Sequence, residues 1–280
     1  MCADERGGSA GRFGRPLPRW LRVFLLVNVV QDFAIGFSGL VTPKHIVIPL
    51  KDLSPLSARF IAGLYVGGGV IILIVAFVHW AVDARIALYC LSVITILVLI
   101  MTFVYWHAFS VDGTPWVWLI TYIVDPIVAP LALVTLGVLG AAEPGRHRLT
   151  ALFAGQALVF GGAGIALMIA PDAMLTAWPW GLTRTLSRVY AAFFLAFAVG
   201  AVLAAGERRV AAIRPFLIGS IALLVATLSA TLVHPARIDD GLSRWLWFGA
   251  HAVGIAILAL ALTTPGRDSR WRGSLATPPP

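Results

Sequence analysis

The sequence predicts an all-α, polytopic membrane protein with eight transmembrane helices, arranged as two parallel four-helix repeats. The composition, the spacing of the apolar segments and an internal repeat lead to this prediction. Of the 280 residues, 59% are apolar and 12% are charged, whereas a soluble domain carries about 25% charged residues. This composition excludes a disordered chain, a coiled coil and collagen, and it argues against a cytosolic enzyme.

Eight apolar segments are each long enough to cross a membrane, for which a helix needs about 20 residues. Prolines, glycines and charged residues separate these segments. We expect helices because transmembrane strands are shorter and alternate in polarity. The predicted spans are 23–42, 58–82, 86–109, 116–140, 149–170, 186–206, 213–233 and 244–263.

The distribution of basic residues predicts the orientation. Residues 1–22 form a basic arm, and the apolar run after it is too long for a signal peptide, so we expect it to remain as an anchor. With a cytoplasmic N-terminus, 14 of the 21 Lys and Arg residues lie inside. The seven on the outer side are Lys44, Lys51, Arg59, Arg184, Arg188, Arg237 and Arg244. The excess of Lys and Arg on the inner side predicts a plasma-membrane protein with both termini in the cytoplasm. Residues 264–280 are predicted to form a disordered tail.

An internal repeat divides the spans into two units, 23–140 and 149–263. Individual glycine, proline, arginine, histidine and tryptophan residues of the first unit recur in the second unit, in the same order and 127 to 129 residues later. The segments around them are otherwise apolar. The recurring pairs are Gly36 and Gly164, Pro43 and Pro171, Arg59 and Arg188, His107 and His234, and Trp118 and Trp247. Four spans is an even number, so both units enter from the same side. We therefore expect a pseudo-two-fold axis along the membrane normal.

Each unit also resembles a known family. A first helix leads through a Gly-rich turn (Gly36, Gly39) to Pro43, and a second helix opens with Arg59 and continues into the Gly- and aliphatic-rich segment 63–69. The second copy has Gly164, Pro171 and Arg188, followed by residues 190–200. This pattern is similar to DoxX-like four-helix membrane proteins over nearly all of both repeats, although this chain carries two copies. Some of those relatives resemble redox-associated or quinone-linked subunits, which implies a subunit role as an alternative function.

Two carboxylates are predicted to lie near the middle of the membrane. Asp32 and Asp125 are each about ten residues into their spans, and ionisable groups at that depth are functional candidates. Asn28 and Gln31 share a helix face with Asp32. Pro126 and Pro130 have no backbone N–H, so they leave helix carbonyls close to Asp125 without a donor. The second repeat has Phe160 and Gly254 at the corresponding positions. We predict a proton or cation site at Asp32, Asp125, Asn28 and Gln31; alternatively, the two acids only hold the first and fourth helices together.

Other polar residues support less specific interpretations. Arg59 and Arg188 open the second helices of their repeats, where they either bind an anion or lipid headgroup or extend to the interface. His107 and His234 are the only histidines at matched depth, and we expect rim residues there rather than haem or metal ligands. No cofactor, metal site or catalytic residue is therefore predicted.

The leading predicted function is the binding or translocation of a small or lipophilic molecule, with proton linkage. The alternatives are a non-catalytic subunit of a membrane redox or envelope-biogenesis assembly, and an intramembrane lipid-modifying enzyme. No soluble catalytic motif occurs, so an enzyme is the less favoured of these classes. The expected partners are the lipid bilayer and other membrane proteins, and not nucleic acid, because the basic residues are scattered between apolar segments.

Overall fold

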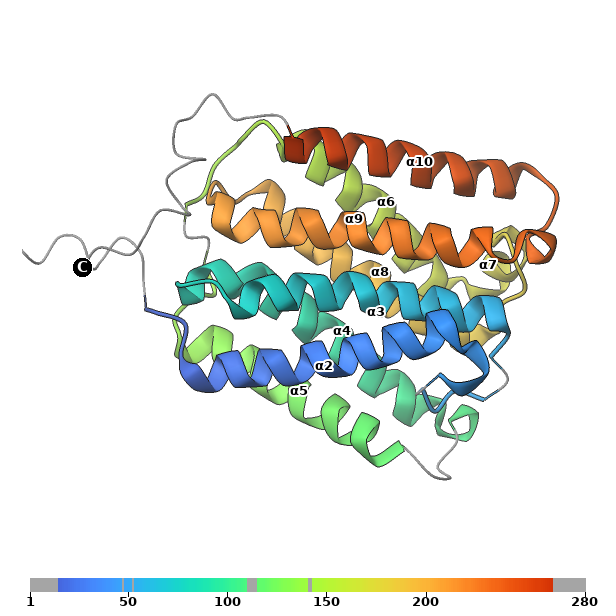
Figure 1. Cartoon of the computed structure of the whole chain (residues 1–280), viewed down its shortest axis with the longest axis horizontal. Helices are drawn as coiled ribbons and strands as arrows, with labels where there is room; N and C mark the ends of the chain where they lie inside the picture. The colour runs from blue at the N-terminus through green and yellow to red at the C-terminus, as the bar shows by residue number, and fades with distance from the viewer. Residues whose placement is uncertain (1–14, 47, 52, 110–114, 141–142, 264–280) are drawn as a thin grey trace, which may run out of the picture.

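The structure is a computed structural model that describes residues 15–46, 48–51, 53–109, 115–140 and 143–263 (Figure 1). Residues 1–14 of the predicted basic arm and the predicted tail 264–280 lie outside the described residues. Within the described part, the chain is helical and contains three isolated β-bridges but no strand.

Among the described residues, eight helices are long and apolar enough to cross a membrane, which confirms the predicted all-α fold with eight spans. They run along the long axis of the bundle (Figure 1). These helices are α2 (Arg19–Val41), α3 (Pro55–Ala76), α4 (Arg85–Val104), α5 (Pro115–Thr135), α6 (Thr150–Ile169), α8 (Arg184–Ala205), α9 (Val210–Leu232) and α10 (Leu242–Thr263). A short helix, α7 (Pro171–Ala177), and four 3₁₀ turns, η2 (Pro43–His45), η3 (Ala81–Ala84), η4 (Trp106–Ala108) and η5 (Pro235–Arg237), lie in the links.

The start of α2 and the end of α10 lie at the same end of the bundle, which we call the entry end; the opposite end is the far end (Figure 1). An even number of spans requires this arrangement. The observed helix boundaries lie within about a turn of the predicted ones, with three larger differences. α3 ends at Ala76 rather than at 82, α4 ends at Val104 rather than at 109, and α5 ends at Thr135 rather than at 140.

The end of α5 has a local cause. Gly137 has a φ of 68°, a left-handed conformation that glycine adopts without steric cost. The amide of Val138 then donates to the carbonyl of Leu133 at 3.0 Å, and that of Gly137 to Val134 at 3.1 Å. This is the Schellman pattern that closes a helix. The residues after it are still apolar, so hydropathy alone extends the predicted helix too far.

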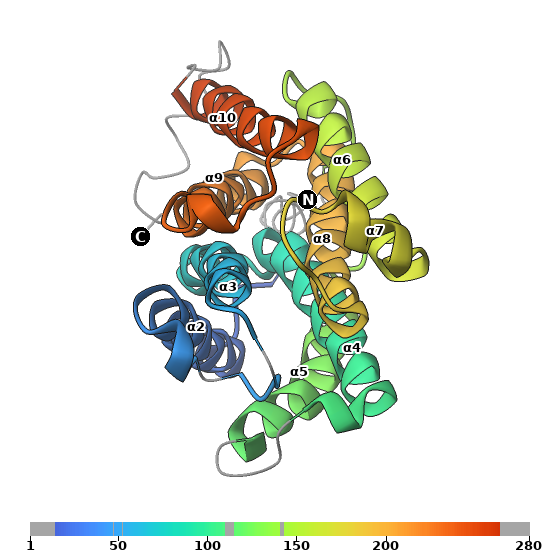
Figure 2. The same cartoon turned by 90° about the vertical axis from the view of Figure 1, so that its right-hand side faces the viewer.

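α3 and α8 form the centre of the bundle (Figure 2). α3 packs against α2 and α9, whereas α8 packs against α6 and α4; α5 lies on α4, and α10 lies on α9. In the order of the two predicted repeats, α2, α3, α4 and α5 correspond to α6, α8, α9 and α10. Every major contact therefore has a counterpart in the other half, and this correspondence supports the predicted duplication.

The backbone hydrogen bonds at the entry end also have the same arrangement in both halves. The amide of Leu17 donates to His79 at 2.8 Å, and that of Ala81 donates to Arg15 at 2.9 Å. In the second half, the corresponding bonds run from Gly145 to Gly206 at 3.2 Å and from Arg208 to Glu143 at 2.9 Å. In each half, the segment that leads into the first helix thus pairs with the link between the second and third helices.

Several tryptophans near the far end are buried. Trp118, Trp178 and Trp180 are only 6%, 6% and 2% exposed. Trp180 packs edge-on against Phe60 and Trp247, with ring centroids 5.1 Å away in both cases. These aromatic rings fill the far end of the core, whereas Trp116 and Trp245 are exposed, as is typical of tryptophans at a membrane interface.

Candidate functional site

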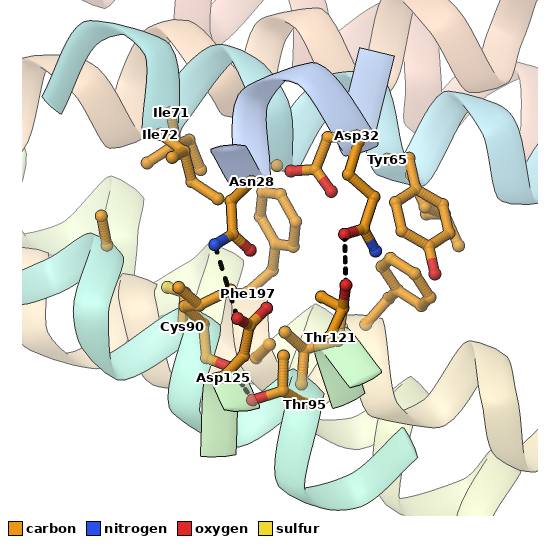
Figure 3. Close-up of a pocket in the computed structure, with 18 of the residues that line it drawn as sticks. Asn28, Asp32, Tyr65, Ile71, Ile72, Cys90, Thr95, Thr121, Asp125 and Phe197 are labelled. Atoms are coloured by element: carbon orange, nitrogen blue, oxygen red, sulfur yellow. Dashed lines mark hydrogen bonds between the residues drawn. The ribbon is translucent and has the colours of Figure 1, made fainter. Parts of the chain in front are cut away.

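A cavity of about 60 Å³ lies among α2, α3, α4, α5 and α8 (Figure 3). By volume it has room for about four water molecules. Its walls are mostly aliphatic and aromatic, and its polar groups come mainly from α2 and α5. The acidic and amide side chains that line it are Asn28, Gln31, Asp32 and Asp125, so the structure brings together all four residues of the predicted site.

The α2 side of the cavity follows from helical spacing. Asn28, Gln31 and Asp32 are three and four residues apart, which places them on one face, and all three line the cavity. Glycines of α3 make room for Asp32: a Cβ at Gly69 would lie 3.0 Å from the Asp32 Cβ, and one at Gly68 would lie 3.8 Å from its Oδ2. The Gly-rich segment of α3 therefore provides space for this acid.

The α5 side supplies Asp125, which is 3% exposed. The Asn28 side-chain amide donates to Asp125 Oδ1 at 3.5 Å, and the Thr121 hydroxyl donates to Gln31 Oε1 at 2.7 Å (Figure 3). These two bonds join α2 to α5 across the cavity. Asp32 and Asp125 both point into the space between them (Figure 3).

A tyrosine pair forms the wall of the cavity toward the far end. The hydroxyls of Tyr65 on α3 and Tyr122 on α5 are 2.5 Å apart, and both side chains are buried. Sequence reasoning missed this pair. Two apolar spans each carrying one tyrosine provide no signal of contact until the helix arrangement is known.

The charge of the cavity is its chemically informative property. Two carboxylates face one space, and no Lys or Arg is among its lining residues in the described part of the chain. A carboxylate within a membrane span is stabilised by a proton, a cation or hydrogen bonds. The arrangement is therefore suited to holding a proton or a small cation between α2 and α5.

The equivalent region of the second half is different. Phe160, which corresponds to Asp32, packs against Phe194 with ring centroids 5.3 Å apart and the rings tilted by 50°. Gln156, which corresponds to Asn28, donates to the Ser220 hydroxyl at 2.9 Å. His251 Nδ1–H donates to the Trp247 carbonyl at 2.9 Å, and its Nε2 shares a hydrogen bond with Thr227 Oγ1 at 3.1 Å. Within the described part of the chain, the pair of acids therefore belongs to the first half only.

The two arginines predicted as anion ligands lie at the far end, apart from the cavity. Arg59 donates to the Leu40 carbonyl at 3.0 Å and contacts the His234 ring. Arg188 lies over the Tyr105 ring at 5.3 Å from its centroid. Each arginine therefore contacts the end of a helix from the other half, and an anion-binding role for either stays a prediction.

The structure does not place His107 and His234 in a common site. The backbone carbonyl of His107 accepts a bond from Lys51 Nζ at 3.2 Å, while the His234 ring contacts Arg59. Among the described residues, no group of three or more His, Cys, Asp or Glu side chains could hold a metal ion.

Two buried ion pairs at the entry end were also missed. Arg85 lies 3.3 Å from Glu207, and Arg209 lies 2.8 Å from Asp83. The acids come from the links 81–84 and 206–209, and each pairs with the arginine of the other half. The signal available in the sequence was an acid-x-Arg triplet, Asp83 to Arg85 and Glu207 to Arg209, in both links.

With this geometry in view, comparisons with known proteins add no family. No protein-family model, no curated protein and no solved structure matches the chain.

Proposed function

We propose that this multi-pass membrane protein takes up a proton or small cation at Asp32 and Asp125, and that this uptake is linked to binding or moving a small or lipophilic molecule. One observation carries the proposal: carboxylates from α2 and α5 line the same cavity within the spans. The mainly aliphatic and aromatic walls favour a lipophilic substrate. At about 60 Å³ the cavity has room for an ion and water, so a larger molecule would enter only when the helices move apart.

The proposal includes the plasma membrane as location and a cytoplasmic entry end. The two-to-one excess of basic residues on that side supports this orientation. The duplication and the likeness to DoxX-like proteins are parts of the same proposal: the first is supported by the paired helix contacts, the second by the sequence pattern alone.

Infrared spectroscopy of the purified protein in lipid tests the site directly. Titration with acid should produce a carboxylic-acid absorption that Asp32→Asn and Asp125→Asn each reduce. Asp172→Asn is the matched control, because Asp172 is exposed and pairs with Arg184 outside the cavity. If both cavity variants keep the full absorption change, the proton site is wrong.

Proteoliposomes then test the linkage to transport. A pH gradient should drive accumulation of lipophilic test solutes by the wild-type protein, and Asp32→Asn should abolish it. Stable co-purification with a larger complex and no flux would favour the subunit role instead.

A further inference from the structure

We propose that the ion taken up at Asp32 and Asp125 is a proton, and that it reaches the acids from the far end through the hydroxyls of Tyr65 and Tyr122. This inference rests on the proposed function and names its ion and its route. It is carried by a second cavity next to the acid cavity, by the tyrosine pair between them, and by what the second half lacks.

A smaller cavity of about 10 Å³ lies between the acid cavity and the far end. Leu50 and Phe109, which form a β-bridge between two links at the far end, are among its lining residues. Its volume is close to that of a single water molecule. A metal cation with its hydration shell does not fit there, whereas a water that carries a proton does.

Tyr65 is the wall shared by the two cavities, because its side chain lines both. Its hydroxyl is 2.5 Å from that of Tyr122, which lines the acid cavity. The two hydrogen-bonded hydroxyls therefore connect the smaller cavity to the acid cavity.

The Trp118 indole provides a polar group at the smaller cavity. Trp118 is buried, lines this cavity and packs on Tyr122 with ring centroids 4.5 Å apart. Its Nε1–H lies close enough to the Tyr65 hydroxyl to interact with it, but makes no hydrogen bond of good geometry within the described parts of the chain. A water in the smaller cavity would accept from this N–H, which would hold it beside the Tyr65 hydroxyl.

The proton balance of the step is simple. A water in the smaller cavity that has taken up an extra proton from the far end gives that proton to the Tyr65 oxygen and remains as neutral water, while the original Tyr65 proton passes to the Tyr122 oxygen. Tyr122 in turn releases its proton, through water in the acid cavity, to a carboxylate. One O–H bond forms and one breaks at each hydroxyl, so both tyrosines end neutral. The titratable side chains that face the acid cavity are Asp32, Asp125, Tyr65, Tyr122 and Cys90.

The second half provides an internal comparison. At the offset of 129 residues, Trp118 corresponds to Trp247, but Tyr65 and Tyr122 correspond to Phe194 and His251. The half without the acids thus also lacks the hydroxyl pair, although it keeps the tryptophan. A purely structural role in packing would not require the hydroxyls to occur only where the acids do.

The test is a rapid external acid jump on the protein in lipid vesicles, with the carboxylic-acid infrared band as readout. Tyr65→Phe and Tyr122→Phe should each slow the rise of this band about tenfold or more, with its final amplitude unchanged. Tyr190→Phe is the matched control: Tyr190 is also buried, but its hydroxyl bonds to the Ser57 carbonyl at 3.4 Å, away from both cavities. In Tyr190→Phe the carboxylic-acid band should rise at the wild-type rate.

Two further measurements make the outcome decisive. The wild-type rise should be slower in D₂O, and replacing Na⁺ with choline at constant pH should change neither its rate nor its amplitude. Unchanged rates in both tyrosine variants, a loss of amplitude in them, or competition by Na⁺ would each overturn the inference. If the band rises at the wild-type rate in both tyrosine variants but is lost in Asp32→Asn and Asp125→Asn, the tyrosine route is wrong and the acid site remains supported. If Asp32→Asn and Asp125→Asn keep the full band, the route and the acid site are both wrong.

Discussion

Four charged side chains cross between the two halves at the entry end. Arg85 and Glu207 are 3% and 0% exposed, and Glu207 Oε1 also accepts from the backbone amides of Glu143 at 3.2 Å and Arg209 at 3.0 Å. Removing one partner of a buried pair leaves an uncompensated charge. These residues therefore matter more for stability than their small number suggests.

We expect Arg85→Met to lower the free energy of unfolding by about 3–5 kcal/mol. The double variant Arg85→Met with Glu207→Gln should recover part of this loss, because it leaves no unpaired charge. Thermal unfolding in detergent measures the effect. Arg184→Met is the control: its pair with Asp172 is exposed, and water screens it, so little change is expected. Equal losses in the buried and exposed variants would contradict the prediction.

His234 at the far end provides a pH dependence. Burial lowers the pKa of His234, and the nearby Arg59 and Arg237 guanidinium groups lower it further. Below the ordinary histidine pKa of about 6.5, the unfolded chain thus binds more protons than the native protein. Stability should therefore fall as the pH drops through that value.

The melting temperature measured across this pH range checks this expectation. His234→Gln should lose less stability on acidification than the wild-type protein does. Arg59→Gln should show an intermediate loss, because it removes one of the two neighbouring positive charges. Identical pH profiles for the wild-type protein and His234→Gln would refute it.

At the residue scale, sequence reasoning identified the acids but not their surroundings. The helical rise placed Asp32 and Asp125 at similar depth, and helical spacing placed Asn28 and Gln31 beside Asp32. That spacing does not determine which helices face each other. The bonds from α2 to α5 and the contact of Tyr65 with Tyr122 therefore required the structure.

At the scale of elements, glycines determine how closely α3 and α9 approach. A Cβ at Gly67 would lie 2.4 Å from the Leu223 Cβ, and one at Gly219 would lie 2.1 Å from Ile71 Cγ1. Both distances are too short for real side chains. Small residues at such contacts are typical of helix packing in membranes.

We expect Gly67→Ala to lower the free energy of unfolding by about 1–3 kcal/mol, because α3 and α9 must separate to admit the methyl group. Gly155→Ala in α6 is the control, since nothing lies within 4 Å of a Cβ there. It should be neutral or slightly stabilising, as alanine is the better helix former. Thermal unfolding distinguishes the two, and equal stability of both variants would count against the prediction.

The helices themselves were largely predictable, whereas their links were not. Eight apolar segments of sufficient length specify eight spans, but α7 was not predicted, because Pro171 and Asp172 directly follow the span 149–170 and a proline beside a charge predicts the end of a helix. Pro171 instead occupies the first position of α7, where a missing N–H is tolerated. Helix termini depend on such local bonds, which hydropathy does not detect.

At the scale of the whole molecule, the sequence predicted the number of spans but not how they pack. Lipid-facing and buried surfaces of a membrane helix are both apolar, so the pattern does not reveal which faces meet. The central position of α3 and α8, and their contacts with α9 and α4 of the opposite halves, are properties of the assembled bundle.

The orientation can be tested with reporters. A green fluorescent protein fused after the C-terminus should fluoresce, and alkaline phosphatase at that position should be inactive, because the entry end is expected in the cytoplasm. Alkaline phosphatase inserted at Gly181, in the link before α8 at the far end, should be active. The opposite pattern would invert the proposed topology.

The crossed ion pairs at the entry end have a consequence for the origin of the chain. A single four-helix unit with one acid-x-Arg triplet could join a second copy of itself through two identical pairs, the acid of each copy meeting the arginine of the other. That is the isologous contact of a symmetric homodimer. After fusion of two such genes, one copy could lose its cavity acids while the other kept the function. Asp32 and Asp125 would then identify the first half as the copy that retained the ancestral chemistry.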